Sequence, residues 1–486
     1  MRFRVRFTEQ DQSFRVKFKE VIPITDGGYE RGYADGYAQC GIDGQYANKL
    51  PQVFNKTIAS ITAEDMDGAE SIVGRFFKNC TLLTTVELPS TVKSVDAYAF
   101  EGCIALESAI IPGSVKSISS YAFRNCTALH SISIAEGLET ISSNVFEGCT
   151  ALESIEIPDS VNSIDSYVFR NCTAMKSITL PKSVTKFGSS MFTGCSSLES
   201  IEIPAGVTKL YGMFTGCTSL KSVVFLGDDT IIDEYADLFK DLSALESVTL
   251  PANLVSIPGE TFSNCSSLRS IEIPDSVTSI GSEAFYGCRA LESISLPAGL
   301  TTIGTWAFEY CKALKSIEIP VSVTSMGNSI FAYNTSLETV TLHEGLLTIP
   351  NSIFKGCAAL KSIAIPDSVT EIASGAFAYC DALESVTFGE NSQLTTIGDT
   401  AFSECKQLKS IVIPASVTTI NRWAFARISF NSITIKATTP PTLTNSEGLG
   451  YQTTTTVITV PRGCGDAYKS ATNWSKYAKY IVEGDV

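Results

Sequence analysis

A phenylalanine recurs at a nearly constant interval through most of this 486-residue chain. The interval is 23 residues except for one of 22, after Phe192, and two of 25, after Phe214 and Phe377. We call these sixteen residues the marker phenylalanines: Phe77, Phe100, Phe123, Phe146, Phe169, Phe192, Phe214, Phe239, Phe262, Phe285, Phe308, Phe331, Phe354, Phe377, Phe402 and Phe425. A fixed period of about 20 to 50 residues is the signature of a repeat array, so the chain is predicted to be a repeat protein.

One repeat unit, "FYGCRALESISLPAGLTTIGTWAF" from Phe285 to Phe308, shows what each coil contains. Ile294 and Leu296 alternate with polar residues, as a short strand with one buried face requires. Pro297 ends the strand because its nitrogen carries no hydrogen for a further ladder bond. A single unit cannot bury its apolar face, but stacked neighbours can. The predicted fold class is therefore a repeat solenoid of about sixteen 23-residue coils that form one long parallel sheet.

Thirteen of the fifteen cysteines lie three residues after a marker phenylalanine. They are Cys80, Cys103, Cys126, Cys149, Cys172, Cys195, Cys217, Cys265, Cys288, Cys311, Cys357, Cys380 and Cys405. Leu242, Asn334 and Ile428 fill this position in the other three units, and leucine cannot replace a metal ligand. Zinc sites also need closely spaced pairs. Cysteines at one repeated position have parallel rather than facing Cβ vectors, which disfavours disulfides. The pattern therefore favours free, buried core cysteines over disulfides or a metal site.

A second regularity concerns charge. The residue seven positions after each marker alternates between acidic and basic, as in Glu153, Lys176, Glu199 and Lys221. Stacked strands lie about 4.8 Å apart, so these side chains are predicted to form a row of ion pairs. Exposed pairs of this kind contribute about 0.2–1 kcal/mol each.

The repeat resembles a known family, the BspA-like or Treponema-pallidum-type leucine-rich repeats. The matching pattern is L-x-x-I-x-I-P-x-S-V-x-x-I followed by F-x-x-C, as in Leu152–Cys172, and it covers about residues 70–435. The resemblance implies a right-handed solenoid that is used for binding, often on bacterial or protist surfaces. Members usually carry export signals. The start of this chain, "MRFRVRFTEQDQSF", lacks an apolar segment, so a cytoplasmic or virion-associated location is expected unless a non-Sec route exports it.

Composition argues against several classes of protein. The net charge of −15 leaves no generally basic surface for nucleic acid. No apolar run approaches the roughly 18 residues of a membrane-spanning helix, so no membrane insertion is expected. The chain has only two histidines and no nucleophile, H-E-x-x-H, P-loop or dinucleotide-binding motif. The sequence therefore predicts a protein that is not an enzyme and needs no cofactor or metal.

The two ends differ from the repeats, and a solenoid needs caps. We predict an N-terminal β-hairpin over residues 1–25, a Gly/Tyr-rich helix or linker over 26–60, the solenoid over 61–435 and a strand–helix cap over 436–486. Within the cap, Asp466 is expected to be the N-cap of one helix. Residues of the 26–60 segment recur every four positions and are candidates for self-association: Gly28, Tyr29, Gly32, Tyr33, Gly36 and Tyr37.

Two sets of residues are candidates for ligand binding. The first comprises glutamates ten residues after a marker, which should point outward from the strands on the concave face: Glu156, Glu202, Glu272 and Glu318. The second lies in an irregular acidic segment, residues 226–242, and comprises Asp228, Asp229, Asp233, Glu234 and Asp237. Because the repeated face looks alike from coil to coil, a specific partner is expected to use the irregular segment or the N-terminal module.

The leading hypothesis for function is a non-enzymatic, adhesin-like scaffold that binds a protein or a glycan. The alternative is a structural or receptor-binding subunit of a larger assembly, such as a phage or cell-surface appendage, docked through the N-terminal module.

Overall fold

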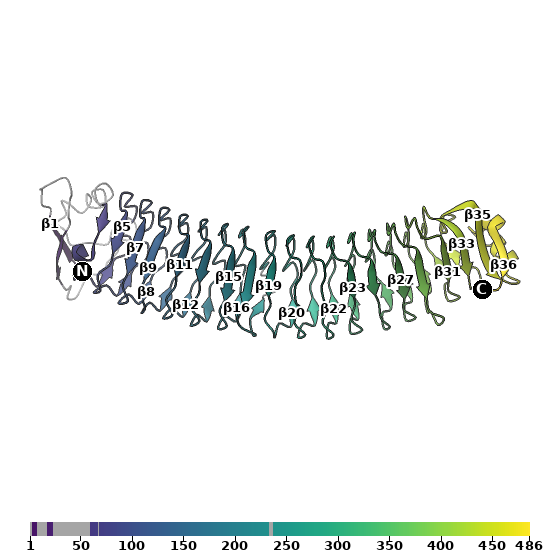
Figure 1. Ribbon diagram of the computed structural model, residues 1–486, viewed down its shortest axis with the longest axis horizontal. Helices are drawn as coiled ribbons and strands as arrows, with labels where there is room; N and C mark the ends of the chain where they lie inside the picture. Colours follow the sequence, from purple (N-terminus) through teal and green to yellow (C-terminus); the bar gives the residue numbers. More distant parts are fainter. Residues whose placement is uncertain (1, 7–16, 23–58, 67, 233–236) are drawn as a thin grey trace, which may run out of the picture. The chain divides into compact units, whose positions relative to one another are not determined.

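The computed structural model describes residues 2–6, 17–22, 59–66, 68–232 and 237–486 (Figure 1). The chain divides into two compact units, Met1–Ile231 and Ile232–Val486, which are taken in turn. Each is a stack of coils of about 23 residues whose strands pair in parallel, so the predicted solenoid is confirmed. At the N-terminal end, β1 (Arg2–Arg6) pairs with β2 (Lys17–Ile22) in antiparallel fashion.

Most coils contribute two strands rather than the one that the sequence predicted. The coils around Ile271 and Ile294 are exceptions, because no longer strand is assigned there, and the predicted strand at Ile294 and Leu296 is therefore absent. In the first unit, the longer strands are β3 (Ser60–Ile61), β5 (Thr85–Glu87), β7 (Ser108–Ile111), β9 (Ser131–Ile134), β11 (Ser154–Glu156), β13 (Ser177–Thr179), β15 (Ser200–Ile203) and β17 (Ser222–Phe225). The two-residue strands are β4 (Ser71–Ile72), β6 (Ser94–Val95), β8 (Ser117–Ile118), β10 (Thr140–Ile141), β12 (Ser163–Ile164), β14 (Lys186–Phe187) and β16 (Lys209–Leu210), and β18 (Ile231–Ile232) lies at the boundary. A short 3-10 helix, η1 (Ala63–Met66), precedes them.

The second unit repeats this arrangement. Its longer strands are β19 (Ser247–Thr249), β23 (Ser316–Glu318), β25 (Thr339–Thr341), β27 (Ser362–Ile365), β29 (Ser385–Phe388), β31 (Ser410–Ile413), β33 (Ser429–Ile435), β35 (Tyr451–Pro461) and β36 (Ile481–Gly484). Its short strands are β20 (Ser256–Ile257), β21 (Ser279–Ile280), β22 (Thr302–Ile303), β24 (Ser325–Met326), β26 (Thr348–Ile349), β28 (Glu371–Ile372), β30 (Thr396–Ile397), β32 (Thr419–Ile420) and β34 (Thr442–Leu443). A two-residue strand is too short to show an alternating pattern, so sequence periodicity misses it.

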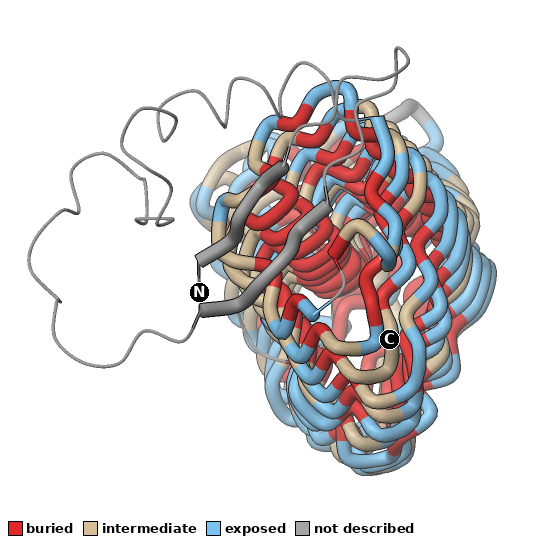
Figure 2. The backbone as a smooth tube through the Cα atoms, turned by 90° about the vertical axis from the view of Figure 1, so that its left-hand side faces the viewer, coloured by how far each residue is buried: buried red, intermediate tan, exposed pale blue. Residues whose placement is uncertain are grey.

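The marker phenylalanines form stacked columns in the core of each unit. In the second unit, the rings of Phe262, Phe285 and Phe308 lie 5.1 Å apart between centroids and are nearly parallel. In the first unit, the Phe192–Phe214 distance is 6.1 Å, where the sequence interval shortens to 22. Figure 2 shows buried residues along the inner side of the coils and exposed residues on the outer turns. The rings thus fill the centre of every coil and fix its register.

The thirteen repeated cysteines are free and buried, as predicted. Twelve of them also donate a weak hydrogen bond from Sγ to the backbone oxygen of the marker phenylalanine in the preceding coil. For Cys126 the acceptor is the oxygen of Phe100, at 3.2 Å. The same oxygen accepts the amide of Cys103. Cysteine therefore suits this position because it is small, apolar and still able to donate.

The turn around each marker needs backbone in the left-handed region at two positions, two residues before and two residues after the phenylalanine. After Phe123 the second position is Asn125, with φ 58°, and after Phe146 it is Gly148, with φ 73°. A Cβ atom at Gly148 would lie 2.3 Å from Oδ1 of Asn125. The alternation of asparagine and glycine along this turn therefore has a steric cause: with its side chain in this position, each asparagine leaves room only for glycine in the next coil.

The C-terminal cap differs from its predicted form. The sequence predicted one helix with Asp466 as N-cap, but α2 (Gly465–Ser470) has Cys464 as N-cap without a side-chain capping bond. A 3-10 helix, η2 (Ser475–Tyr480), follows after Asn473, whose positive φ of 65° interrupts the helix. Trp474 is buried and donates from Nε1 to the oxygen of Pro441 at 2.8 Å. The tertiary contacts of Trp474 thus determine where the helix ends, although the apolar periodicity of the sequence predicts a longer helix.

Substitution of Gly148 by alanine tests the steric explanation of the asparagine–glycine alternation. Alanine in the left-handed region costs about 1–2 kcal/mol, and here the new methyl group also displaces Asn125. Gly216→Ala is the matched control, because Gly216 also has a positive φ of 80°, but a Cβ atom there would lie no closer than 3.4 Å to its neighbours. We expect Gly148→Ala to lower the urea midpoint more than Gly216→Ala does. Equal shifts would contradict the steric explanation.

Candidate functional site

The longer strands present a row of exposed polar side chains on their outward face. In β11 and β13, Ser154 lies opposite Ser177 and Glu156 lies opposite Thr179, and all four are exposed. Between them, Ile155 points inward and is buried. We call this row of alternate residues the outward strand face. It therefore repeats hydroxyl groups at every coil and carboxylates at some of them.

The four glutamates predicted from the sequence are all exposed, but no two of them face each other across a strand pair. Glu202 lies opposite Val224, and Glu318 lies opposite Thr341. Glu272 is exposed in a segment without assigned strand structure. His343 Nε2 lies 3.4 Å from Oε1 of Glu318. Carboxylates are thus spaced out along the face rather than gathered at one point.

The predicted row of ion pairs runs beside this face. The four pairs seven residues after the markers are Glu153–Lys176 at 2.9 Å, Glu199–Lys221 at 3.0 Å, Arg269–Glu292 at 3.5 Å and Glu338–Lys361 at 3.5 Å. The hydrogen bond from Lys176, together with its charge, lowers the pKa of Glu153. These exposed charges are already paired within the chain, so they favour register over ligand binding.

The other predicted site residues are only partly described. Asp228 and Asp229 are exposed in the first unit, and Asp237 is exposed in the second. Asp233 and Glu234 lie outside the described residues, as do Gly28, Tyr29, Gly32, Tyr33, Gly36 and Tyr37. Binding by the acidic segment and self-association through residues 26–60 therefore stay predictions.

Sequence reasoning missed a second surface, built by the residue that directly follows each marker. We call this row the flank row; in the first unit it begins Lys78, Glu101, Arg124, Glu147 and Arg170. Glu101 lies 2.6 Å from Lys78 Nζ and also pairs with Arg124. The alternation of charge in this row was visible in the sequence and could have indicated these pairs.

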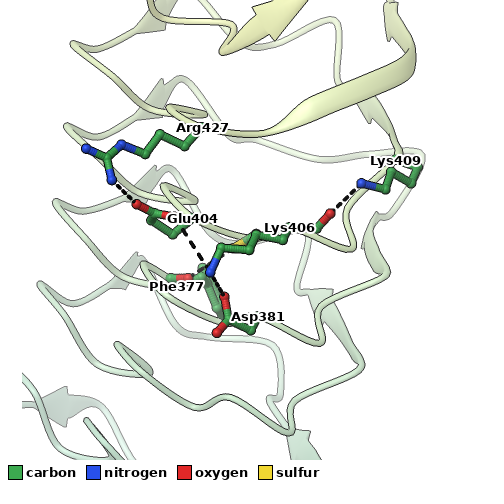
Figure 3. A network of polar contacts seen from close by, with 7 residues as sticks. Phe377, Asp381, Glu404, Lys406, Lys409 and Arg427 are labelled. Atoms are coloured by element: carbon green, nitrogen blue, oxygen red, sulfur yellow. Dashed lines mark hydrogen bonds and ion pairs between the residues drawn. The ribbon is translucent and has the colours of Figure 1, made fainter.

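A polar network near the end of the second unit illustrates how such pairs link coils (Figure 3). Lys406 Nζ lies 3.0 Å from Oδ1 of Asp381 in the preceding coil. Glu404 Oε1 lies 2.6 Å from Arg427 in the following coil. The charges of these side chains are paired with one another, so the network stabilises the stacking of three coils.

Glu344 and Glu136 act as clamps between coils. Glu344 accepts the amide hydrogens of Asp367 and Ser368, each at 2.9 Å, and these two bonds lower its pKa below the ordinary value of 4.5. Glu136 accepts the amides of Asp159 and Ser160 in the same way, each at 3.1 Å. Both glutamates are the first residue of the sequence E-G-L, and each binds backbone amides of the turn in the next coil.

Two further features are absent from the part of the chain that the structure describes. Among the described residues, no group of three or more histidine, cysteine or acidic side chains is arranged to hold a metal ion. Of the helices in the described part of the chain, none is long and apolar enough to cross a membrane.

Comparison with known proteins points to one family. A family model described as "BspA type Leucine rich repeat region (6 copies)" matches residues 52–152, 139–237, 230–359 and 331–445. A search of curated proteins found no match. Among solved structures, a leucine-rich repeat protein from Bacteroides ovatus ATCC 8483 is 22% identical, with 80% of this chain and 98% of that chain covered and a TM-score of 0.44.

Two further solved structures are similar. A leucine rich cell surface protein from Faecalibacterium prausnitzii A2-165 is 30% identical, with 68% of this chain and 88% of that chain covered and a TM-score of 0.38. The pneumococcal vaccine antigen PcpA is 22% identical, with 73% of this chain and 80% of that chain covered and a TM-score of 0.37.

The Glu344 clamp predicts a pH-dependent contribution to stability. Because its pKa is lowered in the folded chain, the contribution is present above the ordinary value of 4.5 and is lost as pH falls through the lowered pKa. Glu344→Gln should therefore lower the urea midpoint near neutral pH, and the difference from the parent should shrink in acid. Glu384→Gln, at an exposed position, is the control. A difference that stays constant with pH would contradict the clamp.

Proposed function

The chain belongs to the BspA type leucine-rich repeat family, and on that basis we propose that it is a non-enzymatic scaffold whose outward strand face binds a protein or a glycan. The observation that carries this proposal is the register of exposed side chains. Serine lies opposite serine in β11–β13 and in β15–β17, with a carboxylate two residues further along β11 and β15.

Such a face suits an extended ligand. Glu156 and Glu202 lie two coils apart, which at about 4.8 Å per strand is roughly 10 Å. The hydroxyls between them donate and accept hydrogen bonds, whereas the carboxylates only accept. A ligand with hydroxyl or amide groups at a similar repeat, such as a polysaccharide or an extended peptide, would satisfy several coils together.

The chemistry of the buried cysteines supports a role without catalysis. A cysteine nucleophile needs an accessible thiolate. Burial instead raises the pKa of Cys149, Cys195 and Cys357 to about 12 each. These thiols stay protonated near neutral pH and serve packing.

Substitution of the four outward glutamates tests which surface binds. The full chain is applied to an array of immobilised polysaccharides and extracellular-matrix proteins. If the outward strand face binds, the combined variant Glu156→Gln, Glu202→Gln, Glu272→Gln and Glu318→Gln should lose at least tenfold in affinity for any probe that the parent retains. The control variant Glu153→Gln alters a neighbouring ion pair and should bind like the parent.

The acidic segment provides the competing outcome. A second variant neutralises Asp228, Asp229, Asp233, Glu234 and Asp237 together. If this variant loses binding while the four-glutamate variant retains it, the irregular segment is the site and the outward strand face is excluded. Circular dichroism of both variants should match the parent, because exposed substitutions rarely change stability by more than about 0.5 kcal/mol.

A further inference from the structure

The flank row of the first unit shows how a half-hidden carboxylate is neutralised on this fold. The side chain of Glu101 is only 6% exposed, and it is held by Lys78 from the preceding coil and Arg124 from the following coil. Arg124 has a second contact, because its guanidinium carbon lies 4.8 Å from the centre of the Tyr121 ring. The chain thus places a guanidinium between a carboxylate and a tyrosine.

In the second unit the same row has a carboxylate without such a partner. The row reads Tyr286, Glu309, Ala332 and Lys355, so the position that corresponds to Arg124 is an alanine. Ala332 ends in a methyl group, which leaves Glu309 without a cation from the next coil. Among the described residues, Glu309 forms no ion pair; Lys355, two coils further on, instead lies 5.8 Å from the ring centre of Tyr333.

Glu309 is in an environment that disfavours its charge. Burial, and then the charge of Glu283, raise its pKa from the ordinary 4.5 to about 7, although Lys355 acts in the opposite direction. A partly buried carboxylate near another carboxylate is stabilised by a cation that comes close to it. Glu309 therefore occupies the same row as Glu101 but lacks the two cations that neutralise Glu101, Lys78 and Arg124.

Tyr286 and Tyr310 lie close enough to Glu309 to feel its charge, because burial and then the Glu309 carboxylate raise the pKa of both phenols. The rings of Tyr310 and Tyr333 stack at 5.0 Å, and Tyr286 meets Tyr310 edge-on at 5.6 Å. Trp306, three residues before Glu309, is 44% exposed. Aromatic rings beside a carboxylate favour a planar cation, because a guanidinium can stack while its N–H groups donate to the carboxylate.

We propose that Glu309, with Tyr310 and Tyr333 beside the buried Ala332, forms a receptor for an arginine side chain of a partner protein. The partner's guanidinium takes the place that Arg124 occupies in the first unit. The ring differs from that of the first unit, because Tyr121 has Ser329 as its counterpart here. The guanidinium would instead lie over Tyr310, as Lys355 of the next coil lies over Tyr333. Arginine fits this place better than lysine because its planar group can stack on a ring while its N–H groups donate to the carboxylate. This surface uses residues other than the outward strand face, so it stands or falls independently of the proposed function.

Fluorescence of Trp306 provides a local test in the full chain. A Trp423→Phe background leaves Trp306 as the exposed tryptophan, because Trp474 is buried. The probes are N-acetylarginine amide and its neutral analogue N-acetylcitrulline amide, titrated at low ionic strength. The proposal expects a saturable change with the arginine probe and a response at least tenfold weaker with the citrulline probe.

Two variants and one control complete the test. Glu309→Gln should weaken the arginine response at least tenfold. Ala332→Arg should abolish it, because the chain's own guanidinium then pairs with Glu309; circular dichroism checks that this variant folds like the parent, since Ala332 is buried. Glu384→Gln should leave the response unchanged. Equal responses to arginine and citrulline, or an unchanged response in Glu309→Gln, would overturn the proposal; a stronger response to N-acetyllysine amide than to the arginine probe would overturn its choice of arginine.

Discussion

Stacking of one phenylalanine per coil is the interaction on which the rest of the structure depends. Consecutive rings lie 5.1–6.1 Å apart in the two units and are almost fully buried. This spacing exceeds the roughly 4.8 Å between paired strands only slightly. The rings therefore hold the ladders in register, and each coil must supply its phenylalanine at nearly the same interval. The thiol row and the turns with positive φ follow from that interval.

Repetition in the core has a consequence on the surface. Every position of the repeat becomes a row that runs along the coils, so charge, hydroxyl groups and tyrosines line up whether or not they bind anything. Glu153 and Lys176 pair within such a row, as do Glu101 and Arg124. A ligand can then bind in two ways: along an uninterrupted row, such as the outward strand face, or at a place where a paired row lacks its expected partner. Glu309, followed by Ala332, is such an interruption in the flank row, whereas the outward strand face is an uninterrupted row.

The sequence predicts the repeat well because its buried positions recur. Phenylalanine and cysteine each recur in the same buried environment thirteen or more times, so the solenoid and the buried thiols could be predicted from the sequence. The strand predicted at Ile294 and Leu296 is not assigned in the structure. Features that depend on contacts between coils were less accessible. The short strands contain too few residues to show a period. The helix α2 ends early because Asn473 adopts a positive φ and Trp474 is held by a hydrogen bond to Pro441.

Asn334 marks a limit of such reasoning. It occupies a cysteine position and is fully buried, yet neither its Oδ1 nor its Nδ2 has a hydrogen-bond partner among the described residues. The structure offers no physical reason for an amide there.

The candidate site was predictable only in part, because the exposure of Glu156 and Glu318 follows from strand alternation, whereas the environment of Glu309 depends on residues from three coils.

Truncation of one stacked ring tests the central claim most directly. Phe285 lies 5.1 Å from both Phe262 and Phe308 in the second unit. Phe285→Ala should cost about 3–5 kcal/mol in urea unfolding, and hydrogen exchange should accelerate in the coils on both sides. Tyr379→Ala, at a half-exposed ring, should change little by comparison. A loss below about 1 kcal/mol, or faster exchange confined to the substituted coil, would contradict the view that the phenylalanine column holds the coils in register.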